Sequence, residues 1–513
     1  MYLICLEKII GSRYSIGGES MKSLKFWFIT GSQHLYGEET LQEVAEHAEE
    51  MVGFFNQQNN ICYEIIYKPV VTTPEEILNT MIEANGDVNC AGVITWMHTF
   101  SPSKMWINGL KAIQKPMLHL HTQFNKEIPW DTIDMDFMNT NQSAHGDREH
   151  GFIFTRMGIK RKVVVGYYQD PKVIERMGKW LNVAAVAYQG ADIKIMRLGD
   201  NMREVAVTEG DKVEAQIKLG WHVNTYGVGD LVEKMKEVTE SQVDDLMEQY
   251  KESYTFADGI LEDSSQREAV RYQAKVEIAL KGMLEEGGFS GFTNTFEDLH
   301  GLKQLPGLAS QRIMEAGFGF GPEGDWKVAA MVRVMKMISG NKGTSLMEDY
   351  TYHLEGGNEA ILGAHMLEIC PTLAEDKPRI EVHTLGIGGK DAPARLTFSG
   401  KEGKAICVSL VDMGGRLRLI ILDVEAIKVP YDMPNLPVAR VLWKPMPSML
   451  ESAEAWIYAG GAHHTAFSYD VTAEEMIDWA ELMDIECIHI NKSTTIPNLK
   501  RELAINELLW KFK

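Results

Sequence analysis

The sequence predicts an α/β protein of several domains, with a parallel sheet first and an antiparallel β domain last. Three observations support this prediction. The chain has 513 residues, which is enough for roughly three to four domains. Buried strand patterns alternate with amphipathic helical patterns up to about residue 200, and from about Arg379 the apolar period changes to two.

The first region, from Lys25 to about Asp200, is typical of βαβ units. Its expected strands are Phe26–Thr30, Cys62–Val70, Gly92–Trp96, Met117–His121, Lys162–Tyr168 and Ile193–Leu198. Helical patterns lie between the early strands, at Glu38–Asn56, Pro74–Ala84 and Lys104–Gln114. Alternation of this kind predicts a parallel sheet.

Polar residues follow three of these strands at their carboxyl ends. They are Gly31-Ser32-Gln33-His34, His98-Thr99 and His121-Thr122-Gln123. Ligands of open α/β sheets bind at that edge, although loops that end strands are often polar without binding anything. Three such loops on one edge favour a site rich in hydroxyl and amide partners.

The rest of the chain is mixed and then mainly β. Helices are expected at Gln242–Ser253, Gln266–Glu285, Leu308–Ala316 and Asp325–Met337. Short strands are expected at Arg379–Thr384, Arg395–Ser399, Ala405–Asp412, Arg416–Asp423, Ala439–Trp443 and Ala455–Ala459. Because Gly, Pro and Asp turns separate them, they predict an antiparallel barrel or sandwich. Two final helices, Ala473–Met483 and Pro497–Trp510, flank a strand at Cys487–Ile490.

Composition excludes several classes of function. Hydrophobic residues make up 45% and charged residues 24%, as in ordinary globular proteins. The net charge of −21 disfavours binding to nucleic acid or to an anionic membrane surface. Six cysteines without a CxxC pair indicate neither a disulfide framework nor a structural zinc site, and fit a reducing cytosol. We therefore expect a cytoplasmic protein without nucleic-acid or membrane partners.

Residues 1–20 differ in character from the rest of the chain. Met21 begins a segment that runs directly into the first strand pattern, and Gly17-Gly18-Glu19 would be encoded by purine-rich codons just before it. Our hypothesis is that residues 1–20 are a translated leader and that Met21 is the natural start. Mass spectrometry of the native N-terminus tests this, and finding Met1 there would contradict it.

A glycine pattern at Gly319–Gly324 has the form G-x-G-x-x-G and precedes a helix. A dinucleotide site requires a strand before this motif, whereas the preceding segment is expected to be helical. Glu323 would also place a carboxylate where the pyrophosphate must lie. The motif therefore does not predict a nicotinamide oxidoreductase.

Four side chains are candidate metal ligands: Glu323, Glu348, His365 and His464. Two carboxylates and two imidazoles would make an oxygen and nitrogen site suited to manganese, cobalt or magnesium. Without thiolates it would be an open catalytic site. Their spacing alone does not decide this, because each residue has an ordinary alternative: a solvated carboxylate, a core histidine or a capped turn. Taken alone, these residues and their spacing predict an acidic cytosolic α/β protein with a candidate metal site.

Long strings of the sequence resemble L-arabinose isomerases. They are GSQHLYG (31–37), HTFSPSKMWI (98–107), HTQFN (121–125), GDNMREVAVTEGDKVEAQIK (199–218), TNTFEDLHGLKQLPG (293–307), EGDWKVAA (323–330), GTSLMEDYTYHLE (343–355), GAHMLEICP (363–371), LGIGGKDAPARL (385–396) and EAWIYAGGAHHT (454–465). The resemblance runs from about Met21 to the C-terminus. Strings of this length at so many places are highly specific.

The resemblance implies a Rossmann-like N-terminal domain (21–193), a central α/β domain (194–344) and a C-terminal domain built around an antiparallel β-barrel (345–513). It also implies a homohexamer with active sites at subunit boundaries. The family converts L-arabinose to L-ribulose with one divalent cation per subunit, usually Mn²⁺, for which Co²⁺ or Mg²⁺ can substitute.

Matched residue by residue, the family's metal ligands fall on Glu323, Glu348, His365 and His464, and the two glutamates are its acid/base pair in a cis-enediol mechanism. The sugar-pocket positions fall on Gln33, Leu35, Met202, Phe296 and Ile387. A side activity on D-galactose is compatible with this assignment. The alternatives are a direct hydride shift, a related isomerase acting on a sugar such as L-fucose, and a non-catalytic sugar-binding protein.

Overall fold

The structure is a computed structural model that describes residues 24–386 and 389–511. These residues form two compact units, which divide between Tyr188 and Gln189. The proposed leader, residues 1–20, and the predicted pocket residue Ile387 lie outside the described residues.

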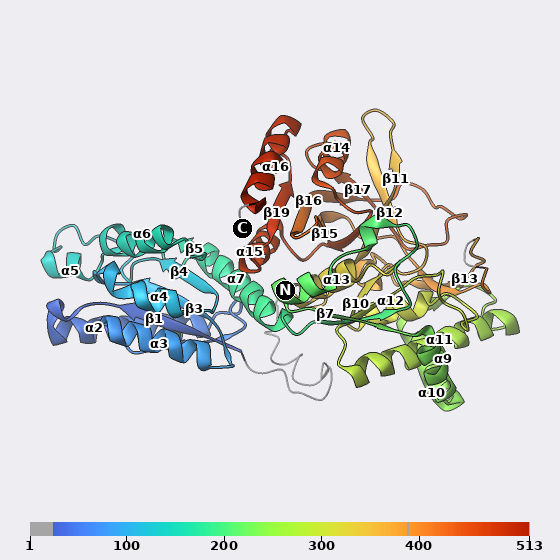
Figure 1. Cartoon of the computed structure of the whole chain (residues 1–513), viewed down its shortest axis with the longest axis horizontal. Helices are drawn as coiled ribbons and strands as arrows, with labels where there is room; N and C mark the ends of the chain where they lie inside the picture. Colours follow the sequence, from blue (N-terminus) through green and yellow to red (C-terminus); the bar gives the residue numbers. More distant parts are fainter. Residues whose placement is uncertain (1–23, 387–388, 512–513) are drawn as a thin grey trace. The chain divides into compact units, whose positions relative to one another are not determined.

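A five-stranded parallel sheet forms the centre of the N-terminal unit (Figure 1). Its strand order is β2-β1-β3-β4-β5, and every neighbouring pair is parallel. The strands are β1 (Lys25–Gly31), β2 (Glu64–Tyr67), β3 (Cys90–Met97), β4 (Met117–His121) and β5 (Lys162–Val165). The parallel sheet predicted for this region is confirmed, but the strand expected at Ile193–Leu198 belongs to a different sheet.

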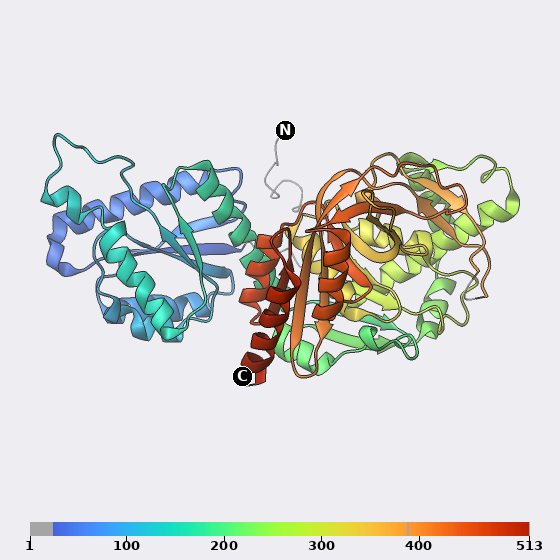
Figure 2. The same cartoon turned by 90° about the horizontal axis from the view of Figure 1, so that it is seen from above.

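Helices cover both faces of this sheet, as Figure 2 shows. Successive side chains of a strand point to opposite faces, so the apolar run of β1 contacts both layers. Phe28 packs against Phe55 on one face, whereas Trp27 and Ile29 belong to a buried cluster that includes Ile77. The helices are α2 (Gly37–Asn56), α3 (Pro74–Gly86), α4 (Ile107–Ala112), α5 (Met135–Asn139), α6 (Arg148–Met157) and α7 (Pro171–Gly190), with short turns η1 (His34–Tyr36), η2 (Ser103–Trp106) and η3 (Ser143–Asp147).

The second unit begins with a four-stranded parallel sheet of order β10-β9-β6-β7. Its strands are β6 (Lys194–Leu198), β7 (His222–Tyr226), β9 (Gly291–Asn294) and β10 (Gly319–Gly321). The helices of this part are η4 (Ala206–Thr208), α8 (Lys212–Leu219), α9 (Val228–Lys236), α10 (Glu240–Ser253), α11 (Ser264–Gly287), α12 (Gly307–Glu315) and α13 (Trp326–Ile338). The four helices expected here are all present.

A seven-stranded sheet of order β15-β18-β11-β12-β17-β16-β19 dominates the C-terminal part. All its pairings are antiparallel except the parallel pair β16–β19, and β15 pairs with β16 as well as β18. The strands are β11 (Thr344–His353), β12 (Ala360–Ala364), β15 (Gly403–Asp412), β16 (Leu417–Ile427), β17 (Arg440–Pro445), β18 (His464–Ser468) and β19 (Glu486–Ile490). The antiparallel character is confirmed, and the barrel stays a prediction.

A smaller sheet of order β14-β13-β8 and four further helical segments complete this unit. They are β8 (Thr255–Phe256), β13 (Arg379–Val382), β14 (Ala394–Thr397), η5 (Pro371–Leu373), α14 (Met449–Ala459), α15 (Ala473–Leu482) and α16 (Ile496–Lys511). One buried cluster contains side chains from α10, α11 and both of these sheets, including Leu246, Ala274 and Trp443. The α/β fold class is therefore confirmed.

The strand expected at Ala455–Ala459 is wrong, because this segment is the second half of α14. Ser448 caps the helix by accepting a hydrogen bond from the Glu451 amide, and Gly460 ends it with a left-handed backbone. The buried side chains Met449, Ser452, Ala455, Trp456 and Ala459 follow the spacing of a helix face. A run of five apolar residues fits either a strand or one side of a helix, and the residues before it decide for the helix.

The strand at the start of the glycine pattern, β10, was not expected, although the helix expected at Leu308–Ala316 is confirmed as α12. Helix α12 ends at Glu315, and the first two glycines of the pattern lie on β10. A Cβ on Gly319 would lie 2.0 Å from the Ala329 carbonyl oxygen, and one on Gly321 would lie 2.2 Å from the Asp325 carbonyl oxygen. These glycines therefore let α13 pack closely on β10. Among the described residues no helix is long and apolar enough to cross a membrane.

Candidate active site

Three of the four predicted metal ligands lie side by side on neighbouring strands. Glu348 of β11 is in register with Ala364 on one side and with His464 on the other. His365 directly follows Ala364 at the end of β12. The antiparallel register therefore brings together residues that are far apart in the sequence.

The fourth residue, Glu323, comes from the loop between β10 and α13. Its backbone is left-handed, with φ of 58°, and Gly324 follows with φ of 77°. A residue other than glycine rarely adopts this conformation, which costs on the order of 1–3 kcal/mol, so contacts around the loop must stabilise it. The Met202 amide donates a hydrogen bond of 2.9 Å to the Glu323 carbonyl. A Cβ on Gly324 would lie 2.4 Å from the Asn201 Cα atom, so only glycine fits.

Carboxylates and imidazoles of the four residues face one another. His365 Nε2 lies 3.9 Å from Glu348 Oε2, and His464 Nε2 lies 3.9 Å from Glu323 Oε2. The centroids of the two imidazole rings are 5.8 Å apart. The structure thus brings all four predicted ligands into one place, with an oxygen and nitrogen donor set.

A second carboxylate lies at the other ring nitrogen of each histidine. Glu368 Oε2 is 2.5 Å from His365 Nδ1, and Asp325 Oδ2 is 3.5 Å from His464 Nδ1. Carboxylates in this position orient metal-binding imidazoles and turn Nε2 toward the ion. Sequence reasoning missed both residues. The available signals were that Glu368 follows His365 by three residues and that Asp325 caps α13.

His463 was also missed as a member of this cluster. Its Nε2 lies 3.5 Å from Glu323 Oε2, and Glu323, His463 and His464 form a group compact enough to hold a metal ion. The two histidines are adjacent in sequence, and His464 is fully buried whereas His463 is about one-third exposed. His463 therefore lies on the solvent side of the cluster.

The electrostatics of the cluster favour an ionised Glu323. Burial raises the pKa of Glu323, but the hydrogen bond from His463 and the nearby imidazoles outweigh it and lower the pKa. Burial lowers the pKa of His365, but Glu368 outweighs it, so the net pKa is raised. Burial lowers the pKa of His464. The site therefore presents an ionised carboxylate beside a neutral imidazole, both suited to a cation.

The donors suit a divalent cation. The Nε2 atom of His464 has no hydrogen-bond partner among the described residues, although the side chain is fully buried. Such a buried polar group ordinarily has a partner, and a metal ion at Nε2 would supply one. Carboxylate oxygens and imidazole nitrogens suit manganese, cobalt or magnesium. The residues present therefore fit the cation that the sequence led us to expect.

A cavity of about 250 Å³ adjoins these side chains. Its lining includes Asn294, Phe296, Glu323, Glu348, Tyr350 and His365. A larger cavity of about 830 Å³ in the same unit is lined by none of the four predicted ligands. The smaller cavity is therefore the candidate active site, because polar and aromatic side chains surround Glu323 and Glu348 there.

The predicted sugar-pocket residues are distributed over both units. Phe296 lines the cavity, and the Met202 amide supports the loop of Glu323. Gln33 and Leu35 belong to the N-terminal unit, where they follow β1, and Leu35 is 83% exposed. Ile387 lies outside the described residues. The sugar-binding roles of these residues stay predictions.

Comparison with known proteins identifies the family. Models of the N-terminal, central and C-terminal domains of L-arabinose isomerase match residues 20–192, 194–341 and 343–486, in that order. The chain belongs to the L-arabinose isomerase family. It is 58% identical to the L-arabinose isomerase of Geobacillus thermodenitrificans (strain NG80-2) over 492 residues, which cover 96% of this chain and 99% of that protein. The L-arabinose isomerases of Geobacillus stearothermophilus and Bacillus subtilis (strain 168) are 59% and 56% identical over the same shares. This member of the family is therefore an enzyme, an isomerase.

Proposed function

We propose that this enzyme converts L-arabinose to L-ribulose with one divalent cation per subunit, Mn²⁺ in the first place and Co²⁺ or Mg²⁺ as substitutes. The observation that carries the proposal is the convergence of Glu323, Glu348, His365 and His464 beside one cavity. Membership of the L-arabinose isomerase family supports the choice of sugar.

The reaction moves one hydrogen from C2 to C1 and a proton between the two oxygens. The C2 hydrogen becomes acidic only when the neighbouring carbonyl is polarised, and a divalent cation supplies that polarisation when bound. Glu323 and Glu348 are the acid/base pair: one carboxylate takes the proton from C2 and returns it to C1, and the other moves the hydroxyl proton. A cis-enediol lies between the two proton transfers.

The surroundings prepare Glu323 for proton transfer. The hydrogen bond from His463 and the nearby imidazoles lower the pKa of Glu323, which keeps the carboxylate ionised, and the side chain is only about one-fifth exposed. The left-handed backbone and the hydrogen bond from Met202 hold its loop in place. A fixed carboxylate in a sheltered place can collect a carbon-bound proton and release it one atom away.

A direct hydride shift would need no base at carbon. Reaction in deuterium oxide distinguishes the two routes, because an exchanging carboxylate introduces deuterium at C1 of the ketose. Proton NMR of the L-ribulose formed measures this label. Absence of deuterium at C1 would exclude a freely exchanging base and favour the hydride shift.

We propose a homohexamer in which the N-terminal sheet of one subunit completes the site of its neighbour. The family resemblance and the 83% exposure of Leu35 support this arrangement. Co-expression of Gln33→Ala with Glu348→Gln tests it, because a mixed assembly would contain some sites with both residues intact. Recovery of activity is expected. Full-size hexamers without recovery would show that each site is built from one subunit.

The decisive experiment is removal and return of the cation. Activity on L-arabinose should disappear on chelation and return with Mn²⁺. Full activity in the ion-free enzyme would refute the proposal, and arabinose bound but unchanged with Mn²⁺ would favour a sugar-binding protein. Relative turnover of L-arabinose, D-galactose and L-fucose ranks the candidate substrates, with L-arabinose expected first and D-galactose as a side activity.

We place the reaction in the cytoplasm, a proposal that the free thiols of all five described cysteines support.

A further inference from the structure

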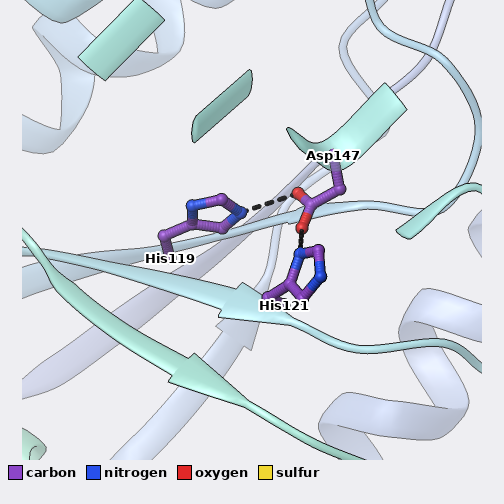
Figure 3. A group of neighbouring side chains, drawn as sticks. All are labelled: His119, His121 and Asp147. Carbon is purple, nitrogen blue, oxygen red and sulfur yellow. Dashed lines mark hydrogen bonds and ion pairs between the residues drawn. The ribbon is translucent and has the colours of Figure 1, made fainter. Parts of the chain in front are cut away.

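A group of three side chains in the N-terminal unit has the composition of a second metal site. His119 and His121 lie two residues apart on β4, so they project to the same face. Asp147 ends the turn η3. Its Oδ1 lies 2.8 Å from His119 Nε2, and its Oδ2 bonds to His121 Nδ1. Figure 3 shows the two imidazoles approaching the carboxylate from different directions.

The carboxylate of Asp147 lacks a permanently charged partner. It is fully buried, and its ion-pair partners among the described residues are the two histidines, without a lysine or arginine. Burial raises the pKa of Asp147, but the bonds to His119 and His121 outweigh it and lower the pKa. An ionised carboxylate in the interior is costly unless it is paired or binds a metal. A cation between the three groups would remove this cost.

The ligand atoms of the three residues lie within 4.8 Å of one another, and a bound ion would require the two hydrogen-bonded pairs to move apart. Imidazole nitrogen and carboxylate oxygen lie about 2.0–2.2 Å from zinc, so two ligand atoms of a tetrahedral site are roughly 3.3 Å apart. The 2.8 Å between His119 and Asp147 is roughly half an ångström shorter than that. His121 has the freedom to move outward, because 23% of its side chain is exposed. The exposed side also leaves one coordination position for water.

We propose that His119, His121 and Asp147 form a site for a divalent transition ion, zinc or cobalt, built from the N-terminal unit alone. Two nitrogen donors and one carboxylate favour such ions over magnesium or calcium. The ion would join β4 to η3 and so hold both ends of the connection 122–146. The site is distinct in its residues from the Glu323 cluster, and the inference does not depend on the proposed function.

Metal stoichiometry of the full-length, chelator-stripped protein tests this site. Zinc is titrated into wild type, His121→Gln, His365→Ala and the control His145→Gln, and bound zinc is counted after dialysis. His145 lies on the same turn but bonds to Gln142 and not to Asp147. We expect two zinc ions per subunit in wild type and in the control, and one in each of the other variants. The zinc affinity of the proposed site should fall at least about 100-fold in His121→Gln, the upper range for loss of a supporting partner.

Two outcomes separate this site from the catalytic one. If His121→Gln binds as much zinc as wild type, the inference is refuted. If His121→Gln loses one ion while His365→Ala loses none, the inference stands and the ligand role proposed for His365 fails. Thermal unfolding provides a second readout, because an ion that binds only the folded state raises the melting temperature of the protein. Zinc should raise the melting temperature of the wild-type protein more than that of Asp147→Asn, and equal rises would contradict the site.

Discussion

Glu368 allows a direct test of how the candidate active site is built. Its carboxylate lies 2.5 Å from His365 Nδ1, whereas Glu348 lies at the opposite ring nitrogen, so we expect Glu368 to act on the site through the histidine. Glu368→Gln keeps the size of the side chain and removes its charge. Loss of such a partner typically weakens metal binding by about 10–100-fold, or about 1.4–2.7 kcal/mol.

The assay is activation of the stripped enzyme by Mn²⁺. For Glu368→Gln we expect the half-saturating Mn²⁺ concentration to rise by about 10–100-fold, with most of the turnover recovered at saturation. Glu381→Gln is the matched control, because Glu381 bonds at 2.7 Å to a different histidine, His383, that is 40% exposed. The reasoning would be refuted if both variants gave the Mn²⁺ requirement of wild type, or if both raised it equally.

Three further predictions concern the glutamate pair and its surroundings. Glu323→Gln and Glu348→Gln should each lower turnover by at least about 100-fold without changing the circular dichroism spectrum; near-normal turnover in either would remove it from the acid/base pair. Gly324→Ala should lower the free energy of unfolding by roughly 2–5 kcal/mol, against about 1–2 kcal/mol for Gly259→Ala, because both have positive φ but only Gly324 meets backbone at 2.4 Å. Equal losses in urea unfolding would show that contact to be unimportant. Burial and the charge of Glu348 raise the pKa of Asp349 to about 7, so its ionisation destabilises the fold as pH rises from about 4 to 7. Asp349→Asn should therefore be more stable than wild type in metal-free buffer at pH 8, with a smaller difference at pH 5, and a pH-independent difference in melting temperature would count against this.

The strands of the N-terminal unit and the helices between its early strands were predictable because their signals are local, whereas α5, α6 and α7 were not predicted. The central strands β1, β3 and β4 are short, almost fully buried apolar runs, and the amphipathic pattern of a helix such as α3, which has a capping box, lies between them. The strand β4 has the bounds expected from sequence, Met117–His121. By contrast, Ala455–Ala459 was misassigned because five apolar residues fit either a strand or one side of a helix. The cap at Ser448 and the stop at Gly460 contained the missing information.

The candidate site was predictable only through the family resemblance. Glu348 and His464 are 116 positions apart, and antiparallel pairing of β11 with β18 makes them direct neighbours. Periodicity contains no signal for pairing between distant strands. Glu368 and Asp325 were missed because they contact Nδ1 of the two histidines, on the side away from the predicted metal site. Their positions follow from side-chain directions that only the structure shows.

The alignment of Glu348 with Ala364 and His464 has a consequence for how this protein can vary. Inserting or deleting one residue within β11 would turn Glu348 to the opposite side of the sheet, and a compensating change in β12 or β18 could not restore both partners at once. Length changes are therefore tolerable in the hairpin between β11 and β12 but not before Glu348. The candidate active site thus depends on the register of three strands as much as on the residues that those strands contain.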